Sequence, residues 1–112
     1  MLNVNPETVR FIIDKAHEFQ MLDVEPDDDS GEARDPAYAE LKATIDDLEP
    51  DQQVDLISLM WVGRGDYRAD EWSRALADAR DRWNERTAEY LIGTPLLSDF
   101  LSEGLDRLGI GE

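Results

Sequence analysis

The 112-residue sequence contains no cysteine and a single histidine, His17. Without cysteine the chain cannot form disulfides, thiolate metal sites, iron–sulfur clusters or a thiol nucleophile. One imidazole leaves little for histidine-based acid–base chemistry, and the sequence has neither a Gly-x-Ser-x-Gly elbow nor a glycine-rich phosphate loop. We therefore predict no catalytic residue, no bound metal and no cofactor, and we expect a protein that is not an enzyme.

Long apolar runs are also missing. No stretch approaches the roughly 20 apolar residues that a membrane-spanning helix needs, and Met1–Pro6 lacks the basic residues and apolar core of a secretory signal. We expect no membrane partner and a cytoplasmic location. Nine of the eleven basic residues are arginine, a bias that suggests a GC-rich bacterial genome.

Positive charge is scarce in this sequence. Eleven Lys and Arg residues face 27 Asp and Glu residues, and the formal net charge is -16. Such a chain repels the phosphates of nucleic acid and of an anionic membrane surface, so we expect no nucleic-acid partner. The negative charge is concentrated, because residues 23–51 hold twelve acidic side chains and two basic ones.

Residues 23–35 have almost no apolar side chains and no periodicity, which predicts a long, mobile acidic loop. Asp27–Asp29 invite a calcium interpretation, because hard cations prefer carboxylate oxygens. An EF-hand that began at the first of these residues would need glycine and then glutamate where the chain has Glu32 and Tyr38. The sequence favours a solvated loop, with a weak divalent site as the alternative.

Apolar residues recur at helical spacing through most of the chain, with capping residues and prolines at the ends of each run. The spacing predicts five helices, over residues 6–21, 36–48, 50–62, 69–92 and 95–108. No segment shows the period-two alternation of a half-buried strand. We predict a single all-α domain over residues 1–112, a small irregular bundle of four to five helices with one long acidic loop.

Capping residues and glycines define the predicted helix ends. Asn5 is the predicted cap of the first helix, and Thr94 with Pro95 is expected to cap and open the last one. Gly63 is interpreted as the left-handed residue that ends the third helix, and Gly93 as the end of the fourth.

The aromatic residues are expected to divide between core and surface. Trp61, Trp72 and Trp83 fall on predicted inner stripes and are interpreted as core residues, whereas Phe11 lies on the outer side of the first helix. An exposed aromatic side chain would instead indicate an interface. His17 borders the apolar stripe of the first helix and is interpreted as a boundary residue, not a ligand or general base.

Charged residues of the fourth predicted helix alternate in sign. Asp70 stands four residues before Arg74, and Asp78 stands four residues before Arg82. This spacing predicts a solvated helix face whose ion pairs are each worth roughly a few tenths of a kcal/mol, and not a nucleic-acid footprint.

The turn at residues 63–66 reads Gly-Arg-Gly-Asp, and its two glycines allow a sharp change of chain direction. We take its Arg-Gly-Asp tripeptide, an adhesion signal in extracellular proteins, as coincidence. Arg64 and Arg68, with backbone N–H groups at the start of the next helix, are candidates for a small-anion site that would bind a phosphate or carboxylate. Asp66 belongs to the same candidate site, although its carboxylate competes for these donors.

Three blocks of the sequence resemble a known family. They are LNVNPETVRFII at residues 2–13, WVGRGD at residues 61–66 and RTAEYLIGTPLL at residues 86–97. Together they look like the uncharacterised bacterial domain-of-unknown-function family 3775, from about Leu2 to Gly104. The resemblance implies a small, free-standing bacterial protein without an assigned activity, and it transfers no catalytic or ligand residues. Because loops on a rigid scaffold commonly carry binding residues, a site is expected first at the turns of the last two blocks.

Three functions are compatible with these features. The first is a non-catalytic acidic interaction or regulatory module that binds a protein partner or self-associates, for example as a homodimer. The second is an acidic mimic of nucleic acid that inhibits a DNA-binding protein, which needs regularly spaced surface carboxylates. The third is a small-anion or enzymatic site near residues 63–70, which needs a concave pocket there.

Overall fold

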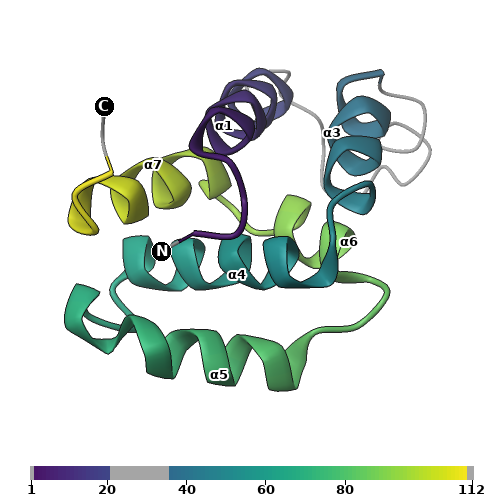
Figure 1. Cartoon of the computed structure of the whole chain (residues 1–112). Helices are drawn as coiled ribbons and strands as arrows, with labels where there is room; N and C mark the ends of the chain where they lie inside the picture. Colours follow the sequence, from purple (N-terminus) through teal and green to yellow (C-terminus); the bar gives the residue numbers. More distant parts are fainter. Residues whose placement is uncertain (1, 21–35, 111–112) are drawn as a thin grey trace.

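The computed structural model describes residues 2–20 and 36–110, and Figure 1 shows how their helices are arranged. The elements are α1 (Pro6–Gln20), α3 (Pro36–Asp46), α4 (Pro50–Arg64), η1 (Ala69–Glu71), α5 (Trp72–Arg82), α6 (Thr87–Ile92) and α7 (Leu97–Arg107). All regular structure within these two stretches is helical, which confirms the predicted fold class. Among the same residues, no helix has both the length and the apolar character needed to cross a bilayer. The predicted acidic loop at residues 23–35 lies outside the described residues.

Helix α4 forms the centre of the fold. α5, α6 and α7 pack against it, and α1 packs against α7 and α3. Figure 1 shows α4 between α5 on one side and α1 with α7 on the other. Every residue from Gln53 to Gly63 is buried, which is typical of a helix that is surrounded by other elements and not of one that covers a surface.

The contact between α4 and α7 is close because each helix presents a glycine to the backbone of the other. A Cβ atom on Gly63 would lie 1.8 Å from the carbonyl oxygen of Phe100. A Cβ atom on Gly104 would lie 2.3 Å from the carbonyl oxygen of Leu59. Both distances are far shorter than van der Waals contact, so the two helices approach each other only where side chains are absent.

The end of α4 differs from the prediction for Gly63. This residue lies within the helix, and the left-handed residue is Gly65, with a φ of 95°. The N–H of Gly65 donates to the carbonyls of Trp61 and Val62, and the N–H of Asp66 donates to the carbonyl of Trp61, which closes the last turn. Sequence spacing alone did not distinguish the two glycines, because the first is required by the distant helix α7.

The number of helices also differs from the prediction. The described residues form six α-helices, not four to five, because the helix predicted over residues 69–92 is divided. A 3-10 turn precedes α5, α5 ends at Arg82, and α6 begins only at Thr87.

Side-chain hydrogen bonds interrupt the helix between α5 and α6. Trp83 leaves the helical region with a ψ of 139°, and its indole Nε1 donates to the buried Gln53 on α4 at 2.6 Å. Oδ1 of Asn84 accepts from the N–H of Arg86 at 2.7 Å, and Oγ1 of Thr87 donates to the carbonyl of Asn84 at 2.8 Å. Such local bonds compete with the helical ladder, and the tertiary bond to Gln53 favours the break.

Helix α7 begins two residues later than predicted. Its first residue is Leu97, and Leu96 before it adopts a left-handed conformation with a φ of 62°. Oγ1 of Thr94 donates to the carbonyl of Tyr90 at 2.9 Å, so this side chain completes the end of α6 and does not cap α7. A threonine between two helices can serve the backbone of either one.

The exposure of the aromatic residues agrees with the sequence, whereas His17, predicted at the boundary of the apolar stripe, is exposed. Trp61 and Trp72 are buried and Trp83 packs partly buried against the core, as predicted. Phe11 is 42% exposed, and His17 is exposed on α1.

The i, i+4 ion pairs predicted for residues 70–82, Asp70–Arg74 and Asp78–Arg82, are absent from the described part of the chain. Asp70 pairs with Arg68 at 2.8 Å. The carboxylate of Asp78 instead accepts a hydrogen bond from the hydroxyl of Tyr67, because the turn after α4 places the Tyr67 ring against α5.

We expect the Trp83–Gln53 hydrogen bond to stabilise the break between α5 and α6. Trp83→Phe should lower the free energy of unfolding by about 1 kcal/mol, because Oε1 of Gln53 then loses its donor inside the protein. In a double-mutant cycle with Gln53→Leu, followed by urea unfolding, the interaction energy should be about 1 kcal/mol. Additive effects of the two substitutions would show that another feature interrupts the helix.

Candidate functional site

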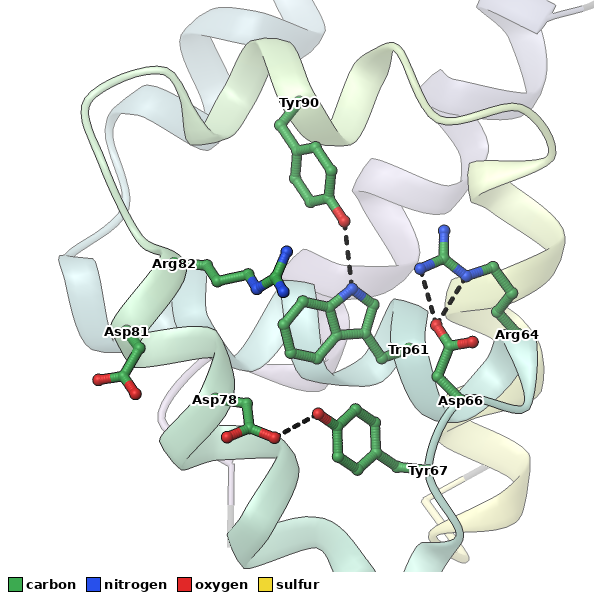
Figure 2. A pocket seen from close by; sticks show the side chains of 8 residues that line it. All are labelled: Trp61, Arg64, Asp66, Tyr67, Asp78, Asp81, Arg82 and Tyr90. Carbon is green, nitrogen blue, oxygen red and sulfur yellow. Dashed lines mark hydrogen bonds and ion pairs between the residues drawn. The ribbon is translucent and has the colours of Figure 1, made fainter.

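A cleft of about 540 Å³ opens between α4, α5 and α6, beside the turn that follows α4. Its lining, shown in Figure 2, consists of Trp61, Arg64, Asp66, Tyr67, Asp78, Asp81, Arg82 and Tyr90. We call it the α4–α5–α6 cleft. Residues from four separate parts of the chain form it: the end of α4, the turn after it, α5 and α6.

Three aromatic rings form the centre of the cleft. Trp61 extends from α4 and stacks on Tyr67, with ring centroids 5.6 Å apart and an angle of 20° between the ring planes. The indole Nε1 of Trp61 donates to the hydroxyl of Tyr90 on α6 at 3.1 Å. These contacts fix the Trp61 ring from two sides, so the interpretation of Trp61 as a core residue describes only part of its environment.

The turn after α4 contributes a paired charge. Nε and a terminal nitrogen of Arg64 donate to the same oxygen of Asp66, at 2.8 and 2.7 Å. This hydrogen bond is the main reason that the pKa of Arg64 is raised above its ordinary value, and the nearby Tyr90 hydroxyl adds to the effect. The side chains of Arg64 and Asp66 are each about two-fifths exposed, so the pair is accessible from the cleft.

Arg68, the third residue of the predicted anion site, lies apart from this pair. Its exposed side chain binds Asp70 at 2.8 Å, and it does not line the cleft. Its backbone N–H donates to the Glu71 carboxylate at 2.9 Å. The structure thus brings Arg64 and Asp66 together in the cleft and places Arg68 outside it, and the binding of an anion stays a prediction.

The α5 side of the cleft carries Asp78, Asp81 and Arg82. The hydroxyl of Tyr67 donates to Asp78, and this bond raises the pKa of the Tyr67 phenol, which stays protonated at neutral pH. Figure 2 shows Arg82 extending toward Trp61 and Tyr90, whereas the carboxylate of Asp81 points away from them. On the α5 side, Asp78 therefore faces Tyr67 and Arg82 faces Trp61 and Tyr90.

A second hollow of about 450 Å³ adjoins the α4–α5–α6 cleft. Arg82 and Tyr90 line both, and the second is completed by Ile57, Asn84, Arg86, Thr87 and Glu89. Three of these residues, Asn84, Arg86 and Thr87, lie where the chain passes from α5 to α6. The interruption that sequence spacing did not reveal thus shapes one side of the site.

Within residues 2–20 and 36–110, no group of three or more His, Asp or Glu side chains is arranged to hold a metal ion. Arg64 and Asp66 pair with each other, Asp78 accepts a hydrogen bond from Tyr67, and His17 is not among the lining residues. The arrangement is suited to holding a ligand through aromatic faces and hydrogen bonds.

Asp55 is a second polar feature of α4 that sequence patterns did not single out. It is fully buried, and Oδ2 accepts the backbone N–H groups of Asn3 and Val4, the latter at 3.0 Å. Oδ1 has no hydrogen-bond partner within the described structure. Burial raises the pKa of Asp55, although the hydrogen bonds from the N-terminal segment oppose this effect.

Several cleft residues were missed by sequence reasoning, above all Tyr67, Asp81 and Tyr90. The turns around residues 63–66 and 93–95 were the expected location of a site, and the first of them does lie at the cleft. The remaining lining residues come from helices whose facing sides depend on the break after α5. The only available signal for Tyr90 was its place within the block at residues 86–97.

Comparison with known proteins identifies one family. A family model described as "Protein of unknown function (DUF3775)" matches residues 38–110. The matched range contains every residue that lines the cleft, but it leaves out the first of the three resembling blocks, at residues 2–13. Neither a curated protein nor a solved structure matches the chain significantly.

Proposed function

Since this chain belongs to the DUF3775 family, whose description assigns no activity, we propose a function from the cleft itself. The domain is a non-catalytic binding module, and the α4–α5–α6 cleft receives a segment of a partner protein. The observation that carries this proposal is the lining of the cleft, where three aromatic rings and two guanidinium groups meet. Trp, Tyr and Arg are the residue types that dominate the energetics of protein interfaces.

The contacts among the lining residues support binding because they fix the site before a partner arrives. Trp61 is held between Tyr67 and Tyr90, and Arg64 is held by Asp66. A site whose side chains are already ordered loses less conformational entropy on association. The hydrogen bond between Tyr67 and Asp78 ties the turn after α4 to α5 in the same way.

Tyr90 is the residue through which a partner would gain most contact. Its side chain is 47% exposed although it is large and aromatic. Its ring lines both the cleft and the adjoining hollow. A segment that covers this ring removes apolar surface from water on both sides of it.

Affinity capture from a native extract, with variants that differ in one ring, tests this function. Wild-type protein should retain a specific partner, and Tyr90→Ala should reduce its retention at least about tenfold, as truncation of a central interface aromatic typically does. Phe11→Ala is the matched control, because Phe11 is a similarly exposed aromatic residue on α1 and does not line the cleft. Thermal unfolding of each variant verifies that the fold is retained.

The purified partner must then shift the indole N–H resonance of Trp61 in a ¹H–¹⁵N correlation spectrum. Equal loss of the partner with Tyr90→Ala and Phe11→Ala, or unchanged retention with both, would contradict binding in the cleft. If the captured protein is a second copy of this chain, and analytical ultracentrifugation shows a dimer, the cleft is a self-association surface. That result would contradict the proposal that it binds a different protein.

A further inference from the structure

Arg82 is the arginine of the cleft that is not paired with a carboxylate among the described residues. In the cleft, Arg64 is paired with Asp66, and Asp78 accepts the hydroxyl of Tyr67. The Arg82 guanidinium, by contrast, makes no ion pair or hydrogen bond with any residue that the structure describes. Arg82 is an exposed residue, and its side chain extends toward Trp61 and Tyr90 in the cleft (Figure 2).

The Tyr90 hydroxyl supplies a second donor beside Arg82. Its oxygen accepts the indole N–H of Trp61 at 3.1 Å. A phenol oxygen that accepts a hydrogen bond still has its own proton to donate. The N–H groups of Arg82 and the O–H of Tyr90 therefore border the same part of the cleft, where both are exposed and can donate to one ligand acceptor.

We infer that the acceptor is a carboxylate, and that the partner segment inserts an aspartate or glutamate side chain between Arg82 and Tyr90. This inference rests on the proposed function and specifies the chemistry of its ligand. A carboxylate matches the planar fork of a guanidinium and still has lone pairs for a hydroxyl donor. The residue next to it in the partner is apolar and covers the exposed ring of Tyr90 in the adjoining hollow, whose lining also includes the buried Ile57.

The net charge of the chain restricts the ligand to a single carboxylate. A polyanion would be repelled along its whole length by a protein of charge -16. Repulsion between separate charges is largely screened beyond about 8 Å at physiological ionic strength, whereas the contact with Arg82 is direct. The proposed ligand group is thus an anion, as predicted for the turn at residues 63–66. The arginine that binds it is Arg82 and not Arg68.

Three blocked dipeptides that differ only in charge test the inference. N-acetyl-Leu-Glu-amide, N-acetyl-Leu-Gln-amide and N-acetyl-Leu-Lys-amide are titrated into the full chain, and the Trp61 indole N–H resonance is followed. This resonance is assigned by its loss in Trp61→Phe. The glutamate peptide should cause a saturable shift, and the glutamine peptide should bind about tenfold more weakly, because a charge-assisted hydrogen bond is replaced by a neutral one.

Arginine variants complete the test. Arg82→Gln should weaken binding of the glutamate peptide about tenfold, whereas Arg68→Gln, outside the cleft, should leave it unchanged. Preference for the lysine peptide, or equal binding of the glutamate and glutamine peptides, would overturn the inference. Either result would leave the binding module standing, because that proposal is tested separately, by partner capture with the Tyr90→Ala and Phe11→Ala variants. No saturable shift with any peptide would also overturn the carboxylate assignment.

Discussion

Gly63→Ala is expected to lower the free energy of unfolding by roughly 2–4 kcal/mol, the range of severe overpacking. The added methyl group would lie 1.8 Å from the carbonyl oxygen of Phe100, and a backbone atom cannot rotate away as the end of a side chain can. α4 and α7 must separate along their contact, and this cost exceeds the gain of about 1 kcal/mol that alanine brings to a helix interior. Circular dichroism at 222 nm should show a melting temperature lower by roughly 10–20 °C.

Gly65→Ala is the matched control for this substitution. A Cβ atom there meets nothing within 4 Å, but the φ of 95° is unfavourable for alanine, so a loss of only about 1 kcal/mol is expected. Gly104→Ala, on the other side of the same contact, should resemble Gly63→Ala. If Gly63→Ala is no more destabilising than Gly65→Ala, the close approach of α4 and α7 is wrong.

Asp55→Ala is the second large effect that we expect, with a loss of roughly 2–4 kcal/mol. The substitution removes the acceptor of two backbone N–H groups, at Asn3 and Val4, and Val4 is itself buried. The segment before α1 then loses its anchor on α4. Asp51→Ala on the same helix is the control, because its side chain is 67% exposed and should contribute no more than about 0.5 kcal/mol. Equal effects in urea unfolding would contradict an anchoring role for Asp55.

The pH dependence of stability should identify the protonation state of Asp55. Its pKa is raised by burial in the folded protein, so the folded state binds the proton more tightly than the unfolded chain does. Asp55 therefore contributes most to the free energy of unfolding at a pH below the ordinary aspartate pKa. This contribution declines as the pH rises from the pKa of the unfolded state to the raised pKa of the folded state. Asp55→Asn does not ionise, so its stability relative to wild type should increase across this window in urea unfolding. A constant difference between the two proteins would contradict the raised pKa.

Features that depend on neighbouring residues were accessible from the sequence. Asn5 caps α1 as predicted, because its Oδ1 accepts the N–H of Glu7 at 2.8 Å and both partners lie in one turn of chain. The starts of the helices at Pro6, Pro36 and Pro50 follow from the fixed φ of proline. The exposure of Phe11 followed from helical periodicity alone.

Features that depend on distant partners were not accessible in the same way. The break after α5 requires a hydrogen bond between Trp83 and Gln53, which lie 30 residues apart in the chain. Asp55 finds its backbone partners 51 and 52 residues away. A local pattern contains no information on which glycine, tryptophan or carboxylate meets another element, so Gly63 was taken for a helix terminator and Asp55 was not noticed.

The sequence by itself determined an all-helical domain without cysteine chemistry, a strongly negative charge and most of the helix starts, because composition and local capping are properties of single residues and their close neighbours. Only the tertiary structure decided that α4 is surrounded, that the predicted helix over residues 69–92 is divided, and that Trp61, Arg82 and Tyr90 face one cleft. Those three residues share no periodic pattern. Their meeting results from the packing of α5 and α6 on α4, whose contacts join segments that are far apart in the chain.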